Sequence, residues 1–272
     1  MLEDHGQKRQ TVRFDKEKHR RAPDPWTSEV NNMIIIHDSR LPASYREGLN
    51  KLVPGVRCFA LNMAERGTVY ASILSHPDIY FFQIAPDTLV HAPNVPETFL
   101  TEMEKTGVKL IRGKNAPTGV YPDTCLYNAV LAGTRMFHNL RYTDPVILNE
   151  AERRGLRPVD VRQGYTRCST FVVDDNAILT QDCGTAEAAG KEGIEVLLIS
   201  GGSVTLPGES SGFLGGAAGW MDGNALLLGD LERHEDAAII NRFLKKHGMG
   251  LRGIKDAEIY DAGGLFMLEP AY

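Results

Sequence analysis

Cys168, a cysteine with polar neighbours, is the residue of this sequence best suited to covalent chemistry. Cys168 begins an apolar run, and a hairpin across the turn cluster Asp174 to Asn176 would bring it near Asp182 or Cys183. A thiol there could act as a nucleophile if its pKa were lowered, with Tyr165 and Asp182 in support. A buried, unreactive cysteine and a redox pair of Cys168 with Cys183 fit the same residues, so three interpretations stay open.

A glycine-rich stretch, Gly201 to Gly219, offers two weaker motifs. Gly208 to Gly212 has the spacing G-x-S-x-G, but that motif requires a sharp turn from a strand into a helix, and no helical pattern follows. The same absence argues against a phosphate-binding loop. We expect Gly215 and Gly216 to let backbones crowd at the centre of the fold or beside a ligand.

The elements that must position these residues form a repeated unit of strand, strand, helix and strand. Around Cys168 the two strands are Cys168 to Val173 and Ala177 to Thr180. The Ala/Glu/Lys segment Thr185 to Glu192 favours a helix, which Gly193 ends. Ile194 to Ile199 is short and apolar, as in a buried third strand.

The same order recurs in three further complete copies and one split copy. The complete copies have two apolar runs around a turn cluster, a helical segment and a glycine stop, and they begin at Ile79, Leu126 and Phe213. The split copy runs from Met33 and lacks only a first strand, which Tyr260 to Leu268 can supply.

Five such units predict a five-bladed α/β propeller, with the last blade closed by pairing the C-terminal strand with the N-terminal unit. An ordinary doubly wound α/β domain is the alternative, but its sheet alternates single strands with helices. We expect one domain over residues 33–272. Residues 1–32 are polar, carry both charge signs and show almost no apolar periodicity, so we expect a disordered extension.

A pocket in this architecture is expected on the axis, where the first strands converge. Three histidines, His37, His91 and His138, end corresponding strands, but no carboxylate pattern completes a metal site, so we expect neither metal nor cofactor. The catalytic candidates are Cys168, Tyr165 and Asp182; the ligand-binding candidates are Asp78, Asn128, His138, Gly215 and Gly216.

Composition restricts the class of partner. The 272 residues carry a net charge of -5, which makes nucleic acid an unfavoured partner. Four cysteines without C-x-x-C spacing and without a secretory signal indicate reduced thiols in the cytoplasm. No apolar run approaches the roughly 18 residues of a membrane helix, so no membrane association is expected. The oligomeric state is left open.

The predicted architecture resembles the pentein fold of the guanidino-group-modifying superfamily, which includes deiminases, dimethylarginine hydrolase, amidinotransferases and a non-enzymatic ribosome anti-association factor. The strings GYTRCS, HNLRYTD and GFLGGAAG, and the T-x-D of Thr180 to Asp182, are similar to those of an uncharacterised bacterial family assigned to that fold. The resemblance covers Met33 to the C-terminus.

The resemblance also implies a departure. The enzymes use a cysteine in the closing strand, a histidine in the fourth unit and carboxylates that hold the guanidinium. Those places fall at or next to Met267, near Tyr165, on Cys125 to Asn128 and on Gln83 with Ile84, so we expect the enzymes' catalytic set to be absent.

Three functional hypotheses follow. The first is a protein that binds a small polar ligand or a partner at the central channel. The second is a divergent hydrolase of C–N bonds in a small amidino or amide compound, with Cys168 as nucleophile. The third is a non-enzymatic ribosome- or RNA-associated factor, against which the acidic charge weighs.

Overall fold

Five three-stranded sheets of identical strand order dominate the computed structural model, which describes residues 33–270. In each sheet the middle strand pairs antiparallel with the first and parallel with the third. The sheets are β17 (Phe266–Leu268), β1 (Ile34–Asp38) and β2 (Arg57–Leu61); β3 (Phe81–Ala85), β4 (Thr88–His91) and β5 (Lys109–Arg112); β6 (Val130–Ala132), β7 (Arg135–His138) and β8 (Arg157–Asp160); β9 (Thr170–Asp174), β10 (Ala177–Thr180) and β11 (Glu195–Leu198); β13 (Ala218–Met221), β14 (Asn224–Leu227) and β15 (Gly250–Gly253).

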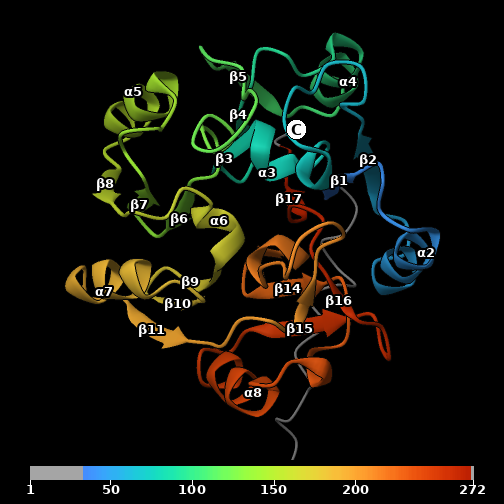
Figure 1. Cartoon of the computed structure of the whole chain (residues 1–272), viewed down its shortest axis with the longest axis vertical. Helices are drawn as coiled ribbons and strands as arrows, with labels where there is room; N and C mark the ends of the chain where they lie inside the picture. Colours follow the sequence, from blue (N-terminus) through green and yellow to red (C-terminus); the bar gives the residue numbers. More distant parts are fainter. Residues whose placement is uncertain (1–32, 271–272) are drawn as a thin grey trace, which may run out of the picture.

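Helices join the second and third strands of these sheets. Figure 1 shows them on the outside of the molecule, with the short helices α3 (Pro77–Tyr80) and α6 (Thr166–Ser169) nearer its middle. The outer helices are α2 (Ala43–Leu52), α4 (Glu97–Glu104), α5 (Pro145–Arg153), α7 (Cys183–Lys191) and α8 (Ala237–Lys246). The predicted order of strand, strand, helix and strand is therefore observed in each sheet.

Local sequence accounts for where the helices begin and end. Asp144 caps α5 by accepting a hydrogen bond from Val146 N, and Pro145 occupies the first helical position. Gly155 follows this helix at φ 66°, a conformation that glycine adopts without steric cost. Each outer helix is followed by a glycine of positive φ, as expected from the sequence: Gly55, Gly107, Gly155, Gly193 and Gly248.

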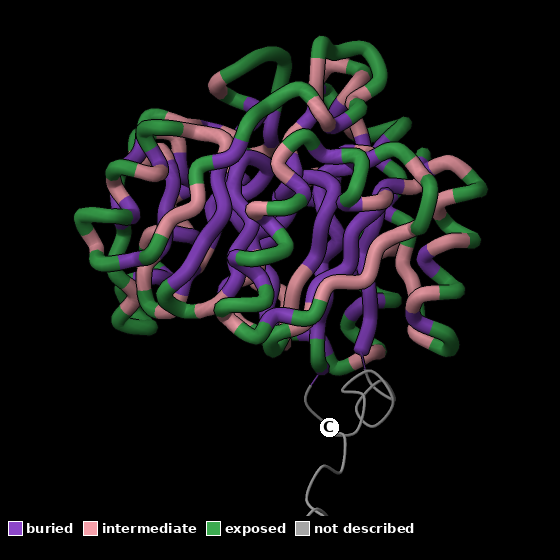
Figure 2. The backbone as a smooth tube through the Cα atoms, turned by 90° about the horizontal axis from the view of Figure 1, so that it is seen from below, coloured by how far each residue is buried: buried purple, intermediate pink, exposed green. Residues whose placement is uncertain are grey.

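The core lies along the middle strands. Every residue of β1, β4 and β10 is buried, whereas the third strands expose about half of their residues. Figure 2 shows buried strands side by side inside the molecule and exposed loops at the rims. A central strand that is buried on both faces reads as a continuous apolar run, which is the pattern of Ile34 to Ile36.

The predicted pairing of the two ends of the domain is confirmed, but over a shorter length. Phe266–Leu268 pairs with β1, with Ile36 opposite Phe266. Tyr260 belongs instead to β16 (Ile259–Tyr260), which pairs with β12 (Val204–Thr205) in a separate two-stranded sheet. Gly263 and Gly264 turn the chain between the two at φ 70° and 76°.

The starts of the first strands also differ from expectation. Cys168 lies in α6 and not in a strand, Ile79 lies in α3, and Gly215–Ala217 forms the 3-10 helix η2. The segments assigned to first strands therefore begin with a helical turn and become extended two to five residues later. No helix between residues 33 and 270 is long and apolar enough to cross a membrane. The predictions for residues 1–32 lie outside the described residues.

Candidate functional site

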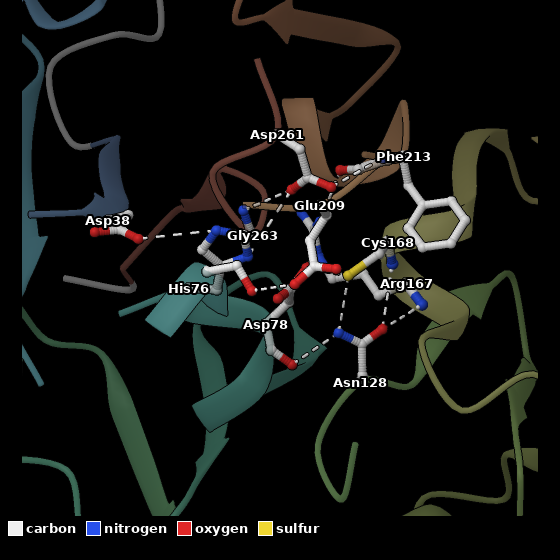
Figure 3. Close-up of polar contacts among 12 residues, drawn as sticks. Asp38, His76, Asp78, Asn128, Arg167, Cys168, Glu209, Phe213, Asp261 and Gly263 are labelled. Carbon is white, nitrogen blue, oxygen red and sulfur yellow. Dashed lines mark hydrogen bonds and ion pairs between the residues drawn. The ribbon is translucent and has the colours of Figure 1, made fainter. Parts of the chain in front are cut away.

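The helical turns that precede the first strands bring polar side chains from different sheets into one cluster at the centre. We call Asp78, Asn128, Arg167, Cys168 and Asp261 the hub cluster (Figure 3). All five residues are buried, with Asp78 and Asn128 completely so. Three of the residues chosen from the sequence, Asp78, Asn128 and Cys168, are thus brought together.

Cys168 is held as a thiol. Its Sγ donates a hydrogen bond to Asp78 Oδ2 at 2.8 Å and accepts one from Asn128 Nδ2 at 3.2 Å. Burial raises the pKa of the Cys168 thiol well above its usual range, and the negative charges of Asp78 and Asp261 raise this pKa further. The environment therefore opposes the thiolate that a cysteine nucleophile requires.

Asn128 fixes the geometry of this contact. Its Oδ1 accepts hydrogen bonds from the backbone N–H groups of Arg167 at 2.8 Å and Cys168 at 3.2 Å. Its Nδ2 also donates to the Asp78 carbonyl oxygen at 3.1 Å. One amide side chain thus ties the second, third and fourth sheets together, which explains why the chain turns at residues 166–169 and does not enter β9 directly.

Arg167 places a guanidinium in the hub. Its Nη1 lies 4.0 Å from Asp78 Oδ2, and its carbon Cζ lies 4.7 Å from the ring centre of Trp220 and 4.6 Å from that of Phe266. Both distances are in the range of cation–π contacts. The chain therefore supplies its own guanidinium beside the hub carboxylate.

Backbone crowding completes the hub. A Cβ added at Gly216 would lie 2.6 Å from Asp261 Oδ2 and closer still to Oδ1. At Gly215 it would meet the carbonyl oxygens of Arg167, Cys168 and Thr170. The expectation that Gly215 and Gly216 permit crowding at the centre is met by this geometry.

Two cavities of about 320 to 330 Å³ border the hub, one at Arg167 and one at Asp261. The one beside Asp261 is lined by more ionisable side chains. It measures about 330 Å³ and is lined by Asp38, Arg40, His76 and Asp261 among others. His76 is buried between two carboxylates, with Nε2 3.9 Å from Asp38 Oδ2 and Nδ1 3.9 Å from Asp261 Oδ1 (Figure 3). We call this space the Asp261 cavity.

The two carboxylates of this cavity are held differently. Asp38 pairs with Arg40 through Nε at 3.1 Å and Nη2 at 2.6 Å. Asp261 accepts from the backbone N–H groups of Phe213 at 2.9 Å and Gly263 at 3.0 Å, and burial raises its pKa. Of the two carboxylates, Asp261 is consequently the one without an ion pair to an arginine or lysine among residues 33–270.

Loops between the sheets cover this side of the hub. Glu209, on the segment between β12 and η2, accepts a hydrogen bond from Ser72 Oγ at 2.7 Å. Tyr165 OH is hydrogen-bonded to Tyr70 OH and to Thr124 Oγ1, and burial raises its pKa. Gly208 is also close to Ser72. The cavity mouth thus lies where segments from several sheets meet.

The remaining residues chosen from the sequence have structural surroundings. Asp182 caps α7 by accepting from Thr185 N at 2.6 Å. His138 is fully buried, bonded to Thr143 Oγ1 at 2.7 Å and Gly164 O at 2.9 Å, and burial lowers its pKa to about 4. Tyr165 is held by the hydroxyl groups of Tyr70 and Thr124. All four cysteines are free, and Cys183 is exposed.

Sequence reasoning missed three residues of this region: His76, Arg167 and Asp261. Each lies next to a predicted strand start, but nothing in the local sequence marks it as different from any other polar residue. Their neighbours come from other sheets, since His76 meets Asp38 and Asp261 across the centre. Position next to a strand start in a repeat was the one signal that could have found them.

Solved structures of several pentein-fold enzymes resemble the chain in fold. An amidinotransferase from the Microseira wollei saxitoxin biosynthetic pathway matches with a TM-score of 0.51 and 10% identity over 89% of this chain and 95% of its own. The C. jejuni agmatine deiminase with substrate bound matches with a TM-score of 0.52 and 10% identity, over 89% and 95%. DDAH from Pseudomonas aeruginosa, complexed with citrulline, matches with a TM-score of 0.50 and 10% identity, over 84% and 92%.

At this level of identity the likeness shows the fold and not the chemistry. The expected resemblance to pentein enzymes is therefore confirmed for an α/β fold of this kind. No curated protein matches the sequence. The sequence model of a family of unknown function (DUF6873) matches residues 36–266, so the chain belongs to that family.

Proposed function

We propose that the protein is a five-bladed α/β propeller of the pentein type that binds a small, positively charged polar ligand in the Asp261 cavity. Five sheets of one strand order and the pairing of β17 with β1 support the propeller. The similarity to amidinotransferase, DDAH and agmatine deiminase structures supports the same architecture. The cytoplasm is the proposed compartment, and nucleic acid is not proposed as a partner.

The charges around the cavity favour a cation. Asp38 is neutralised by Arg40, whereas the contacts of Asp261 with other described residues are to backbone donors and a histidine ring. Burial raises the pKa of Asp261, and a bound cation would lower it again by favouring the carboxylate. A cavity of about 330 Å³ lies at the small end of the range for ligand sites.

One observation carries the choice of binding over catalysis. The Cys168 thiol donates a hydrogen bond to the buried carboxylate of Asp78, and this contact stabilises the thiol against ionisation. A nucleophile would need the reverse arrangement, with a positive charge or a base that lowers the thiol pKa. Cys168 is therefore assigned to holding Asp78 and α6 in place.

Alkylation by iodoacetamide at pH 7.5, followed by peptide mass spectrometry, tests this assignment. Cys183 is exposed and serves as the reference within the same molecule. Burial and the raised pKa leave little Cys168 thiolate at this pH, so Cys168 should react much more slowly than the exposed Cys183. Reaction of Cys168 as fast as Cys183 would contradict the assignment.

Binding itself is tested by calorimetric titration with small amines and guanidines. Asp261→Asn should weaken the binding of a cationic ligand by about tenfold or more, because it removes the unneutralised charge of the cavity. Asp123→Asn is the matched control, since Asp123 is exposed and does not line this cavity. Equal affinities in both variants would place the ligand elsewhere.

A divergent hydrolase that uses Cys168 is the second candidate, and one observation favours it. Asp78 Oδ1 is buried without a hydrogen-bond partner, beside the thiol that Oδ2 accepts from. A cationic amidino compound that reached this oxygen would lower the Cys168 pKa. Faster alkylation of Cys168 in the presence of arginine or agmatine, together with a citrulline-type product, would establish this function over simple binding.

A further inference from the structure

The second cavity lies on the other side of the hub and is distinct from the Asp261 cavity. It measures about 320 Å³ and is lined by residues in or next to the first strands of four sheets: Gln83 to Pro86, Ala129 to Leu131, Trp220 to Asp222, and Leu265 with Phe266. Gly133, Leu156 and Arg167 complete the lining. We call it the Arg167 cavity. Its lining is mostly apolar, with one cation, one carboxylate and one amide.

Arg167 presents an incompletely used guanidinium to this cavity. A guanidinium carries five N–H donors. Nη1 donates to Gly215 O at 3.0 Å, and Nη2 donates to Ala218 O at 3.3 Å and Leu265 O at 3.2 Å. Within residues 33–270 no hydrogen bond from Nε is found, and the second Nη1 proton has only Asp78 at 4.0 Å.

The charge of this guanidinium is also weakly neutralised. Asp78 is the carboxylate nearest to it among the described residues, and its Oδ2 already accepts the Cys168 thiol. Burial lowers the pKa of Arg167, as expected for a cation removed from water. Buried charges are normally paired, so an anion entering the cavity would supply a contact that the chain provides only in part.

We propose that the Arg167 cavity binds a small carboxylate with an apolar body. The carboxylate accepts from Arg167, and the body packs on Trp220, Phe266 and the aliphatic lining. Asp222 stands at the exposed rim and opposes an anion, but Arg167 lies deeper and is better shielded from water. This site is independent of the proposed function, because it lies on different residues from the Asp261 cavity.

Trp220 provides the readout, since it lines the cavity and contacts Arg167. The other tryptophan, Trp26, is replaced by Phe in every sample. Benzoate, benzamide and benzamidine have one shape and carry negative, neutral and positive charge. Benzoate should shift the Trp220 emission in a saturable way, and benzamide should bind about tenfold or more weakly.

Two substitutions of nearly equal size test the charge without touching the hub. Gln83→Glu places a negative charge on the wall and should weaken benzoate binding. Asp222→Asn removes a negative charge from the rim and should strengthen benzoate binding. Asparagine tolerates the φ of 48° at this position. Circular dichroism of both variants verifies the fold.

The outcomes separate clearly. Preference for benzoate, with opposite effects of the two substitutions, supports the proposal. Preference for benzamidine would overturn it and point to the neighbouring acidic turn of Asp174 and Asp175, which lines a larger cavity that also includes Trp220. A linear, unsaturable response to all three compounds would overturn it as well.

Discussion

Substitution of Gly216 by alanine is the sharpest test of the crowded hub. The added Cβ would lie 2.6 Å from Asp261 Oδ2, and a real Cβ essentially never comes closer than 3.0 Å to another heavy atom. The carboxylate cannot move freely, because Phe213 N and Gly263 N hold its two oxygens. Either the backbone of η2 or Asp261 must shift.

The expected loss of stability follows from two unfavourable terms and one favourable term. Overpacking in a core costs about 1 to 3 kcal/mol. Loss of at least one hydrogen bond to Asp261 adds about 1 to 3 kcal/mol. Alanine also restricts the unfolded chain more than glycine does, which adds up to about 1 kcal/mol to the free energy of unfolding. The free energy of unfolding should therefore fall by roughly 1 to 6 kcal/mol, which is the range that these three terms span together.

Gly190→Ala is the matched control. Gly190 lies within α7, and a Cβ there would meet nothing within 4 Å. Alanine should stabilise this helix by about 0.5 to 1 kcal/mol. Urea unfolding followed by circular dichroism compares both variants with the wild type. If Gly216→Ala is as stable as Gly190→Ala, the hub is not packed as described.

Two further predictions concern residues chosen from the sequence that the structure gives a structural role. His138 is fully buried, and burial lowers its pKa from 6.5 to about 4. The unfolded chain therefore binds this proton more readily than the folded chain does. The free energy of unfolding should consequently fall as the pH drops from about 6.5 to 4. Urea unfolding at each pH compares the wild type with His138→Gln, and over that range the wild type should lose about 3 kcal/mol more of its free energy of unfolding. A difference between the two proteins that does not change with pH would contradict the assignment. Asp182→Ala should lower the free energy of unfolding by about 1 kcal/mol through loss of the α7 cap. The alkylation rate of Cys168 should stay unchanged in that variant, and an altered rate would return Asp182 to the candidate site.

The repeat could be predicted because its signals are local. Turn clusters between strand pairs, such as Asp174 to Asn176, and the glycine stops depend on conformations that few residues adopt. The pairing of β17 with β1 was predictable only from the missing first strand of the split unit. The closing strand was predicted from Tyr260, whereas the observed strand begins at Phe266, because the apolar pattern continues through residues that do not pair with β1.

The hub could be predicted only in part. Asp78, Asn128 and Cys168 share a position in the repeat, and that common position brought them into one prediction. The turn at α6 depends on Asn128, which belongs to another unit, so no local pattern indicates it. The pairing of Arg167 with two aromatic rings depends equally on tertiary contacts, from Trp220 and Phe266.

The contact of β17 with β1 has a consequence for synthesis on the ribosome. Ile34 to Ile36 are among the first described residues to emerge, yet the strand that covers their open edge is nearly the last. Until then this apolar strand presents unpaired backbone groups, which is a template for association with another nascent chain. The sheet that contains β1 is thus the first to begin forming and the last to be completed. Protection by chaperones would be needed longest at the open edge of β1.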